Sequence, residues 1–332
     1  MTGTVRGEGR AAAWMPVRLI LCIACLACLP AVPASGVVID TLTGTGNTAA
    51  PADDPGWANV GVRGAGSGVY LGNGWVLTTA SVGGGDIVLG SGTYAMLAGS
   101  GTTLGNAGAA GKSATTDLYL YQLASPPTGL PTLTIASAGP TIGDTVTMIG
   151  AGRDRGSFTQ WSVDTQTNPW TWAEVPSGGS AAGYQTLTSR AMRWGTNTID
   201  HTGVWFGDGF GDAFSFVTSF TDSGAPSNEA QAVAGDLGGA VFRKNGSAWE
   251  LSGLMLTAVG YSGQPDPLFN AIYGDEAIIA DLAFYRPQLI AIVPEPSSVV
   301  ILAPALAVLT TALGRRFRGR RRTAVGGCRE GP

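Results

Sequence analysis

Residues Gly66–Val82, GSGVYLGNGWVLTTASV, set the pattern for the whole chain. Two short runs of β-branched and aromatic residues flank the dipeptide Asn73-Gly74. Asn-Gly favours a two-residue hairpin turn, because both central residues of that turn adopt a positive φ. The segment therefore predicts two antiparallel strands joined by a tight turn.

Similar β-rich runs recur further along the chain, separated by spacers rich in Gly, Ser, Thr and Asn. They include Asp117–Leu123, Thr145–Ile149, Ala240–Arg243 and Trp249–Ala258. The segment from Trp161 to Trp194 has the composition of an elaborated hairpin or insertion. One soluble helix is expected, over residues 275–286, where apolar residues recur at helical spacing before Pro287. The fold class predicted is all-β with a C-terminal helix.

Composition agrees with this class. Glycine supplies 51 of the 332 residues and charged residues make up 13%, against roughly 7% and 25% in average proteins. Glycine has no triplet period, which excludes collagen. A hydrophobic content of 44% is too high for a disordered chain.

The N-terminal residues 1–36 are expected to be a signal peptide. Arg6, Arg10 and Arg18 precede the apolar run Leu19–Ala31, and small residues then offer a cleavage site near Ala34 or Gly36. The run is too short to span a bilayer comfortably. Three of the four cysteines lie in this leader and Cys328 lies in the tail. The exported body therefore has no cysteine for a disulfide.

The C-terminal residues carry a second targeting pattern. Pro294, Glu295 and Pro296 precede the apolar run Val299–Gly314. A cluster of arginines follows this run, namely Arg315, Arg316, Arg318, Arg320, Arg321 and Arg322. An apolar run before a basic cluster predicts a transmembrane helix with its basic end in the cytoplasm. An ordinary single-span anchor is one interpretation of this pattern.

The order of these elements over residues 293–322, with a tail over 323–332, also resembles the PEP-CTERM sorting signal. That resemblance implies a membrane-embedded exosortase as partner. It also implies a location in the cell envelope, either anchored in the membrane or released at the surface after processing.

The body between the two ends is acidic. Residues 37–292 hold nine basic and twenty acidic side chains, a formal net charge of −11. This charge argues against nucleic acid as a partner. The glycine-rich loops lack the Lys-Ser/Thr of a phosphate-binding loop, so no cofactor is expected.

Three stretches of the body, in chain order, resemble the trypsin-like serine protease family. Gly66–Val82 is similar to the hairpin that delivers the catalytic histidine, and Asp117–Leu123 to the strand that begins with the triad aspartate. Gly235–Phe242, GDLGGAVF, is similar to the nucleophile loop. The resemblance covers most of residues 57–290. It implies a double β-barrel within residues 37–292, with one barrel near 57–135, the second near 140–272 and the helix after them.

The chain departs from the family at the residues that matter for catalysis. Ser81 stands at the histidine position and Leu237 at the nucleophile position, whereas Asp117 is retained. Acyl transfer of this kind needs a hydroxyl to attack and an imidazole to accept its proton. We therefore expect no catalytic residue and an inactive, protease-like domain. The amides of Gly235 and Leu237 remain as an oxyanion-hole-like donor pair.

The expected function is a binding or structural role at the cell envelope or extracellular matrix, with a cell-surface polysaccharide or peptide as the ligand. One alternative is an active serine endopeptidase with a non-standard site, pairing Ser223 of TDSGAP with His201, the chain's single histidine. The other is a carbohydrate-associated matrix protein.

The carbohydrate alternative depends on a sugar-stacking face formed by Trp161, Trp170 and Trp172. Elsewhere, Asp208 and Asp212 lie in a glycine-rich loop. Calcium needs six or more oxygen ligands, so a solvated turn is favoured over a metal site there. No metal is expected.

Overall fold

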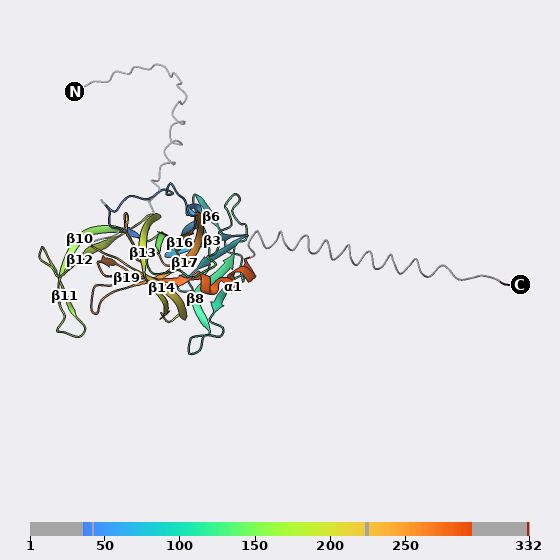
Figure 1. Ribbon diagram of the computed structural model, residues 1–332. Helices are drawn as coiled ribbons and strands as arrows, with labels where there is room; N and C mark the ends of the chain where they lie inside the picture. The colour runs from blue at the N-terminus through green and yellow to red at the C-terminus, as the bar shows by residue number, and fades with distance from the viewer. Residues whose placement is uncertain (1–35, 42, 223–225, 294–330, 332) are drawn as a thin grey trace, which may run out of the picture. The chain divides into compact units, whose positions relative to one another are not determined.

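The computed structural model describes residues 36–41, 43–222, 226–293 and 331. These residues belong to one compact unit, Pro33–Pro332. They contain nineteen strands and one α-helix (Figure 1). The predicted signal peptide up to residue 35, the Pro-Glu-Pro motif, the apolar run and the arginine cluster lie outside the described residues. Within the described ranges, no helix is long and apolar enough to cross a membrane.

The first half of the body forms a curved sheet of seven strands. Their order is β6-β5-β2-β3-β4-β8-β7. An isolated bridge between Met96 and Leu123 joins the chain after β6 to the chain after β8, so the sheet curls back on itself. The strands are β2 (Val60–Arg63), β3 (Gly66–Gly72), β4 (Trp75–Thr78), β5 (Ile87–Leu89), β6 (Gly92–Tyr94), β7 (Thr102–Gly105) and β8 (Thr115–Gln122).

The second half forms a closed barrel of six antiparallel strands in the order β13-β14-β19-β17-β16-β9. The strands are β9 (Thr145–Gly150), β13 (Arg193–Gly207), β14 (Asp212–Ser219), β16 (Ala240–Asn245), β17 (Ala248–Val259) and β19 (Glu276–Asp281). The all-β, trypsin-like double-barrel class expected from the sequence is confirmed.

Three strands inserted between β9 and β13, together with a short strand from between β17 and β19, form a four-stranded sheet, the arm. Its order is β11-β10-β12-β18, with β10 (Arg153–Asp164), β11 (Thr171–Val175), β12 (Ala181–Arg190) and β18 (Asn270–Ile272). In Figure 1 β11 lies at the left end, away from β8 and the helix at the right. The sequence predicted an insertion from Trp161 to Trp194. In the structure the insertion begins before Trp161, and it ends before Trp194, which belongs to barrel strand β13.

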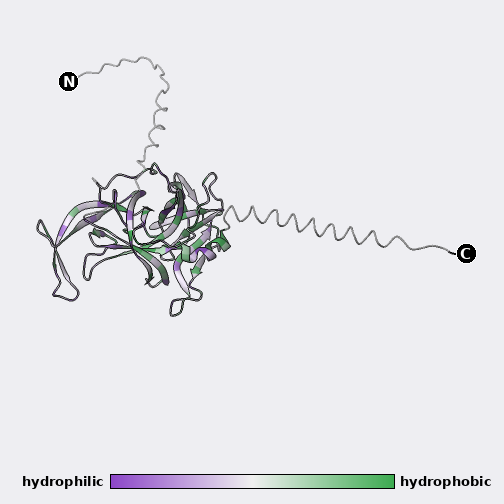
Figure 2. Ribbon diagram, in the orientation of Figure 1, coloured by the Kyte–Doolittle hydropathy of each residue, from purple (hydrophilic) through white to green (hydrophobic). Residues whose placement is uncertain are grey.

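Successive side chains on one strand belong to two different hydrophobic clusters. Tyr70 and Val76 pack inside the first sheet, whereas their neighbours Val69 and Leu77 join a larger cluster that includes Phe242 of the second barrel. Successive residues of a strand point to opposite faces, so one hairpin fills both clusters. The barrel strands carry most of the hydrophobic colour in Figure 2. The two barrels therefore share a buried interface.

The N-terminal end of the described body packs against the second barrel. The strand β1 (Val38–Ile39) pairs with β15 (Ala230–Gln231), and a short 3-10 helix spans Trp57–Asn59. Val37, Val38 and Ile39 are no more than 1% exposed. These residues, immediately after the predicted leader, belong to the core.

The helix prediction over 275–286 is wrong in its bounds. Glu276–Asp281 is strand β19, which pairs with β14 and β17 and lies beyond the predicted limit of the second barrel at 272. The helix α1 spans Leu282–Ile292 and continues past Pro287. The continuous apolar run from Ala277 to Ala280 is typical of a strand buried on both faces, and barrel closure overrides the helical spacing. Asp281 caps the helix by accepting a hydrogen bond from the Ala283 amide.

Candidate functional site

Ser81, which the resemblance places at the histidine position, contacts Asp117 directly. Asp117, on β8, is fully buried. Its Oδ1 accepts a hydrogen bond from the Ser81 amide at 2.8 Å, and its Oδ2 accepts one from the Ser81 hydroxyl at 3.1 Å. Ser81 thus satisfies both oxygens of the carboxylate that would orient an imidazole in the resembled family.

A second carboxyl group lies beside this pair. Asp208, in the loop between β13 and β14, comes from the second barrel, whereas Asp117 comes from the first sheet. Burial, reinforced by Asp208, raises the pKa of Asp117 to about 7, although the Ser81 amide opposes the shift. Two carboxyl groups this close cannot both ionise easily. The protonated form of Asp117 is therefore well populated at neutral pH.

The loop around Leu237 packs against the first sheet. The Leu237 carbonyl accepts a hydrogen bond from the Ser67 amide at 2.8 Å. Gly238 has φ +84°, and a Cβ there would lie 2.3 Å from the Ser67 carbonyl oxygen. Glycine is needed at this position both for its backbone conformation and for the close approach.

The Leu237 loop also lies next to the Ser81 turn. A Cβ placed on Gly66 would lie 2.8 Å from the Leu237 carbonyl oxygen and 2.4 Å from Cγ2 of Val82, the neighbour of Ser81. The Leu237 loop and the Ser81 turn therefore both lie against Gly66 of β3. The structure brings Ser81, Asp117 and Leu237 into one region between the two barrels.

The donor pair expected at Gly235 and Leu237 stays a prediction, and the hydrogen bonds of the described residues are compatible with it. Among described residues, neither the Gly235 nor the Leu237 amide has a hydrogen-bond acceptor. The Gly235 carbonyl accepts from the Ser67 hydroxyl at 2.8 Å and from Arg190 Nη2 at 3.3 Å, which fixes the loop from its other side.

Between the two amides, Asp236 is a buried structural anchor. Its carboxyl oxygens accept hydrogen bonds from the Gly152 and Val233 amides at 2.8 and 2.9 Å. Burial raises its pKa to about 7, against the opposing influence of these bonds and of nearby arginines. Asp236 lies within the Gly235–Phe242 stretch that the sequence analysis singled out. The sequence did not predict its hydrogen bonds to the Gly152 and Val233 amides.

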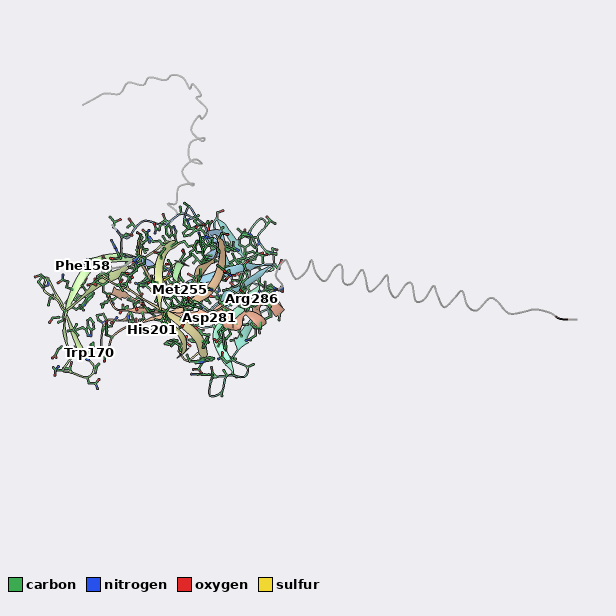
Figure 3. The ribbon with its side chains drawn as sticks, in the orientation of Figure 1. Phe158, Trp170, His201, Met255, Asp281 and Arg286 are labelled. Carbon is green, nitrogen blue, oxygen red and sulfur yellow. The ribbon has the colours of Figure 1, made fainter. Side chains whose placement is uncertain are left out.

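Of the alternative nucleophile and base, His201 lies among the described residues and Ser223 does not, so their pairing stays a prediction. His201 is exposed on β13, opposite Val217, and Figure 3 labels it on the second barrel. None of the hydrogen bonds of Ser81 and Asp117 involves His201. Ser223 lies outside the described residues.

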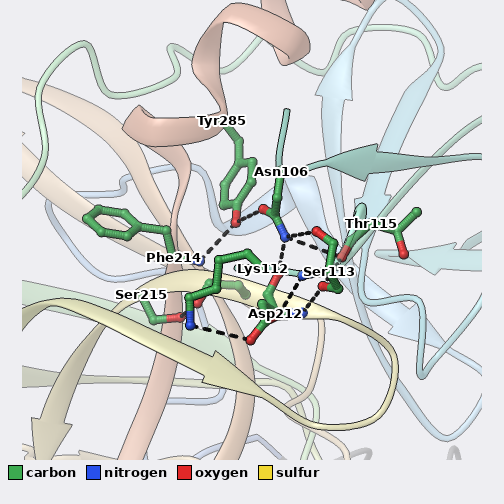
Figure 4. A network of polar contacts seen from close by, with 9 residues as sticks. Asn106, Lys112, Ser113, Thr115, Asp212, Phe214, Ser215 and Tyr285 are labelled. Carbon is green, nitrogen blue, oxygen red and sulfur yellow. Dashed lines mark hydrogen bonds and ion pairs between the residues drawn. The ribbon is translucent and has the colours of Figure 1, made fainter. Parts of the chain in front are cut away.

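Asp212 of the second barrel contacts the loop between β7 and β8 of the first sheet. The prediction of a solvated turn is therefore wrong for Asp212. Its Oδ2 accepts from the Ser113 amide at 2.7 Å, and Lys112 lies 3.7 Å from Oδ1. Asn106 donates to the Asp212 carbonyl at 2.7 Å and accepts from the Tyr285 hydroxyl at 2.9 Å (Figure 4). This network holds the loop that carries Asp208. Among the described residues no cluster of three or more His, Cys, Asp or Glu could bind a metal.

The three tryptophans of the expected sugar-stacking face do not act together. Trp161 is 1% exposed and belongs to the interior, so it is wrongly included in that face. Trp170 and Trp172 are half-buried and both stack on Tyr261. Trp170 lies on the arm in Figure 3. Sequence spacing does not distinguish the inward-facing tryptophan from the outward-facing ones.

The fold class is thus an all-β double barrel, and the resemblance stated above predicts that Ser81 and Leu237 stand at two triad positions. No protein-family model matches the chain, and no curated protein matches it. Similar solved structures include a mutant of human heparin binding protein (CAP37), with 15% identity, a TM-score of 0.46 and coverage of 76% of this chain and 97% of that one. Mouse neuropsin, a serine protease, has 14% identity, a TM-score of 0.43 and coverage of 74% and 97%.

Proposed function

We propose that this chain is an exported cell-surface protein whose trypsin-like domain is catalytically inactive and has a binding or structural role at the envelope or matrix. The observation that carries the proposal is the contact between Ser81 and Asp117, at 2.8 and 3.1 Å. The serine donates a hydrogen bond to each oxygen of the aspartate and provides no base.

The chemistry of acyl transfer supports this proposal. Leu237 has no nucleophilic atom, and a serine hydroxyl at position 81 does not accept a proton at neutral pH. Asp117 with a pKa of about 7 is itself partly protonated. The free amides of Gly235 and Leu237 can bind an anionic oxygen, but donors alone give only a small residual rate over water.

The targeting part of the proposal is supported by the sequence of the two ends. The basic and apolar leader before Gly36 favours export. The motif Pro294–Pro296, the apolar run and the arginines after Gly314 favour membrane insertion and recognition by an exosortase-type enzyme. In this proposal residues 37–292 lie outside the cytoplasmic membrane, either anchored or released after processing.

A restoration experiment tests the inactivity of the domain. The purified chain is incubated with a fluorophosphonate probe beside Ser81→His, Leu237→Ser and the double variant. We expect no labelling of the wild type or of either single variant, because each lacks a base or a nucleophile. Labelling confined to the double variant would identify the two missing groups as the cause of inactivity. Wild-type labelling that Ser223→Ala abolishes would contradict the proposal and move the site to the second serine loop.

A further inference from the structure

A groove of about 840 Å³ lies between the arm and the far end of β14. Its lining includes Ser180 of the arm and Ser219, the last residue of β14. Asp212, in the network beside Asp208, is the first residue of that strand. The seven residue steps from Asp212 to Ser219, at about 3.3 Å each, place the groove roughly 23 Å from the Asp212 network. The groove therefore lies at the opposite end of β14 from the Asp212 network.

One wall of the groove is a strip of three aromatic rings. Trp170 and Trp172 each stack on Tyr261, with ring centroids 6.0 and 6.3 Å apart and interplanar angles of 18° and 29°. Deeper in the groove, Tyr273 stacks on the buried Phe220 at 5.0 Å. All five rings line the groove. Aromatic faces exposed in a concave site offer apolar, flat contact surfaces.

The strip is held in place before any ligand binds. The Trp172 indole N–H donates to the Ser262 carbonyl at 3.0 Å, so its ring orientation is set. The Tyr261 amide donates to Gln264 Oε1 at 2.7 Å, and Gln264 Nε2 donates to Asp275 at 2.7 Å. Asp275 is fully buried. A fixed platform loses little conformational entropy when it binds.

Half of the remaining lining residues are polar, and only one of them is charged. Hydroxyl groups come from Thr165, Ser180, Ser219 and Thr221. Among the described lining residues none is basic, and Asp222 is the single acid. Phosphate, sulfate and carboxylate ligands would find no cation here. A ligand with flat apolar faces and many hydroxyl groups matches both walls at once.

We propose that this groove binds a neutral oligosaccharide segment, with sugar rings stacked on Trp170, Trp172 and Tyr261 and their hydroxyls bonded to the polar wall. The volume lies within the roughly 300–1,000 Å³ of small-ligand sites, so the groove takes a short run of sugar units. A proline-rich peptide would use the aromatic strip but leave the hydroxyl wall unpaired. The inference does not rest on inactivity of the protease-like site.

The test is titration calorimetry on the full chain in a sugar-free detergent. The probes are cellohexaose, laminarihexaose and maltohexaose, with hexagalacturonate and decaproline as comparators. We expect saturable binding of at least one neutral hexasaccharide. Trp170→Ala and Trp172→Ala should each weaken it by about tenfold or more, because each removes a stacking face. The matched control is Trp249→Ala, a half-buried tryptophan whose indole bonds to Asp53 away from the groove.

A protection experiment on the wild type keeps the test decisive if an alanine variant fails to fold. Bound hexasaccharide should slow oxidation of Trp170 and Trp172 by N-bromosuccinimide and leave Trp249 unchanged. Three results would overturn the proposal: no saturable binding of any of the neutral probes, binding that neither alanine variant weakens, or protection by decaproline or hexagalacturonate in place of the neutral sugars.

Discussion

The carboxyl of Asp117 makes a measurable prediction about stability. In the folded chain burial and Asp208 raise its pKa from 3.8 to about 7. The folded state then binds more protons than the unfolded state between these pH values. Since stability rises with pH where the unfolded state binds more protons, here it falls as pH increases from about 4 to 7.

The size of this effect follows from the shift in pKa. One pH unit of pKa difference corresponds to about 1.4 kcal/mol, so ionisation of Asp117 costs about 4 kcal/mol of folding free energy above pH 7. The Asp117→Asn variant has no ionisable group at this position, but the new amide loses one of the two Ser81 hydrogen bonds. That loss costs about 1–3 kcal/mol at every pH.

The two contributions have opposite signs, so their balance changes with pH. Because the wild type has already lost about 1.5 kcal/mol at pH 5, we expect the stability of Asp117→Asn relative to the wild type to rise by about 3 kcal/mol between pH 5 and pH 8. Urea unfolding at both pH values measures this rise. Glu229, Asp236 and Asp275 also have pKa values raised to about 7 by burial. They lower stability over the same range in both proteins, so the difference between the proteins isolates Asp117.

Asp53→Asn serves as the control. Asp53 is exposed, and hydrogen bonds from Lys244 and Trp249 lower its pKa. It is ionised throughout the range from pH 5 to 8, so its substitution should change stability by the same amount at both ends. If the free energies of wild type and Asp117→Asn instead run parallel between pH 5 and 8, the raised pKa of Asp117 is refuted.

Two further predictions concern the backbone and the N-terminal strand. Gly238→Ala should lower the urea midpoint far more than Gly143→Ala, since both have positive φ but a Cβ meets the Ser67 carbonyl at 2.3 Å only at Gly238; similar midpoints would show that the close approach is not needed. A chain beginning at Asp40 should be less stable than one beginning at Val37 by about 5 kcal/mol, because it loses three buried aliphatic side chains. Equal unfolding free energies would show that Val37–Ile39 contribute nothing to the core.

Local chemistry in the sequence was sufficient to predict the turns, and it also supplies the expectation that the catalytic groups are missing. The Asn73-Gly74 turn has φ of 53° at Asn73 and 84° at Gly74. Asn and Gly both tolerate a positive φ, so these two residues are enough to favour the turn. The absence of a nucleophile at Leu237 and of a base at Ser81 is a property of the side chains. The order of the three motifs also predicted the double-barrel class before any strand pairing was known.

Tertiary structure decided what depends on contacts between distant segments. Ala277–Ala280 is a strand because β14 and β17 bury it on both sides, although its apolar spacing also suits a helix. Asp208 meets Asp117 because two barrels pack together, and no local pattern links the residues. Trp161 turns inward while Trp170 and Trp172 line a groove, since the pairing of the arm strands selects the face. Propensity and turn chemistry act over a few residues, whereas burial is determined by the neighbours that the whole fold provides.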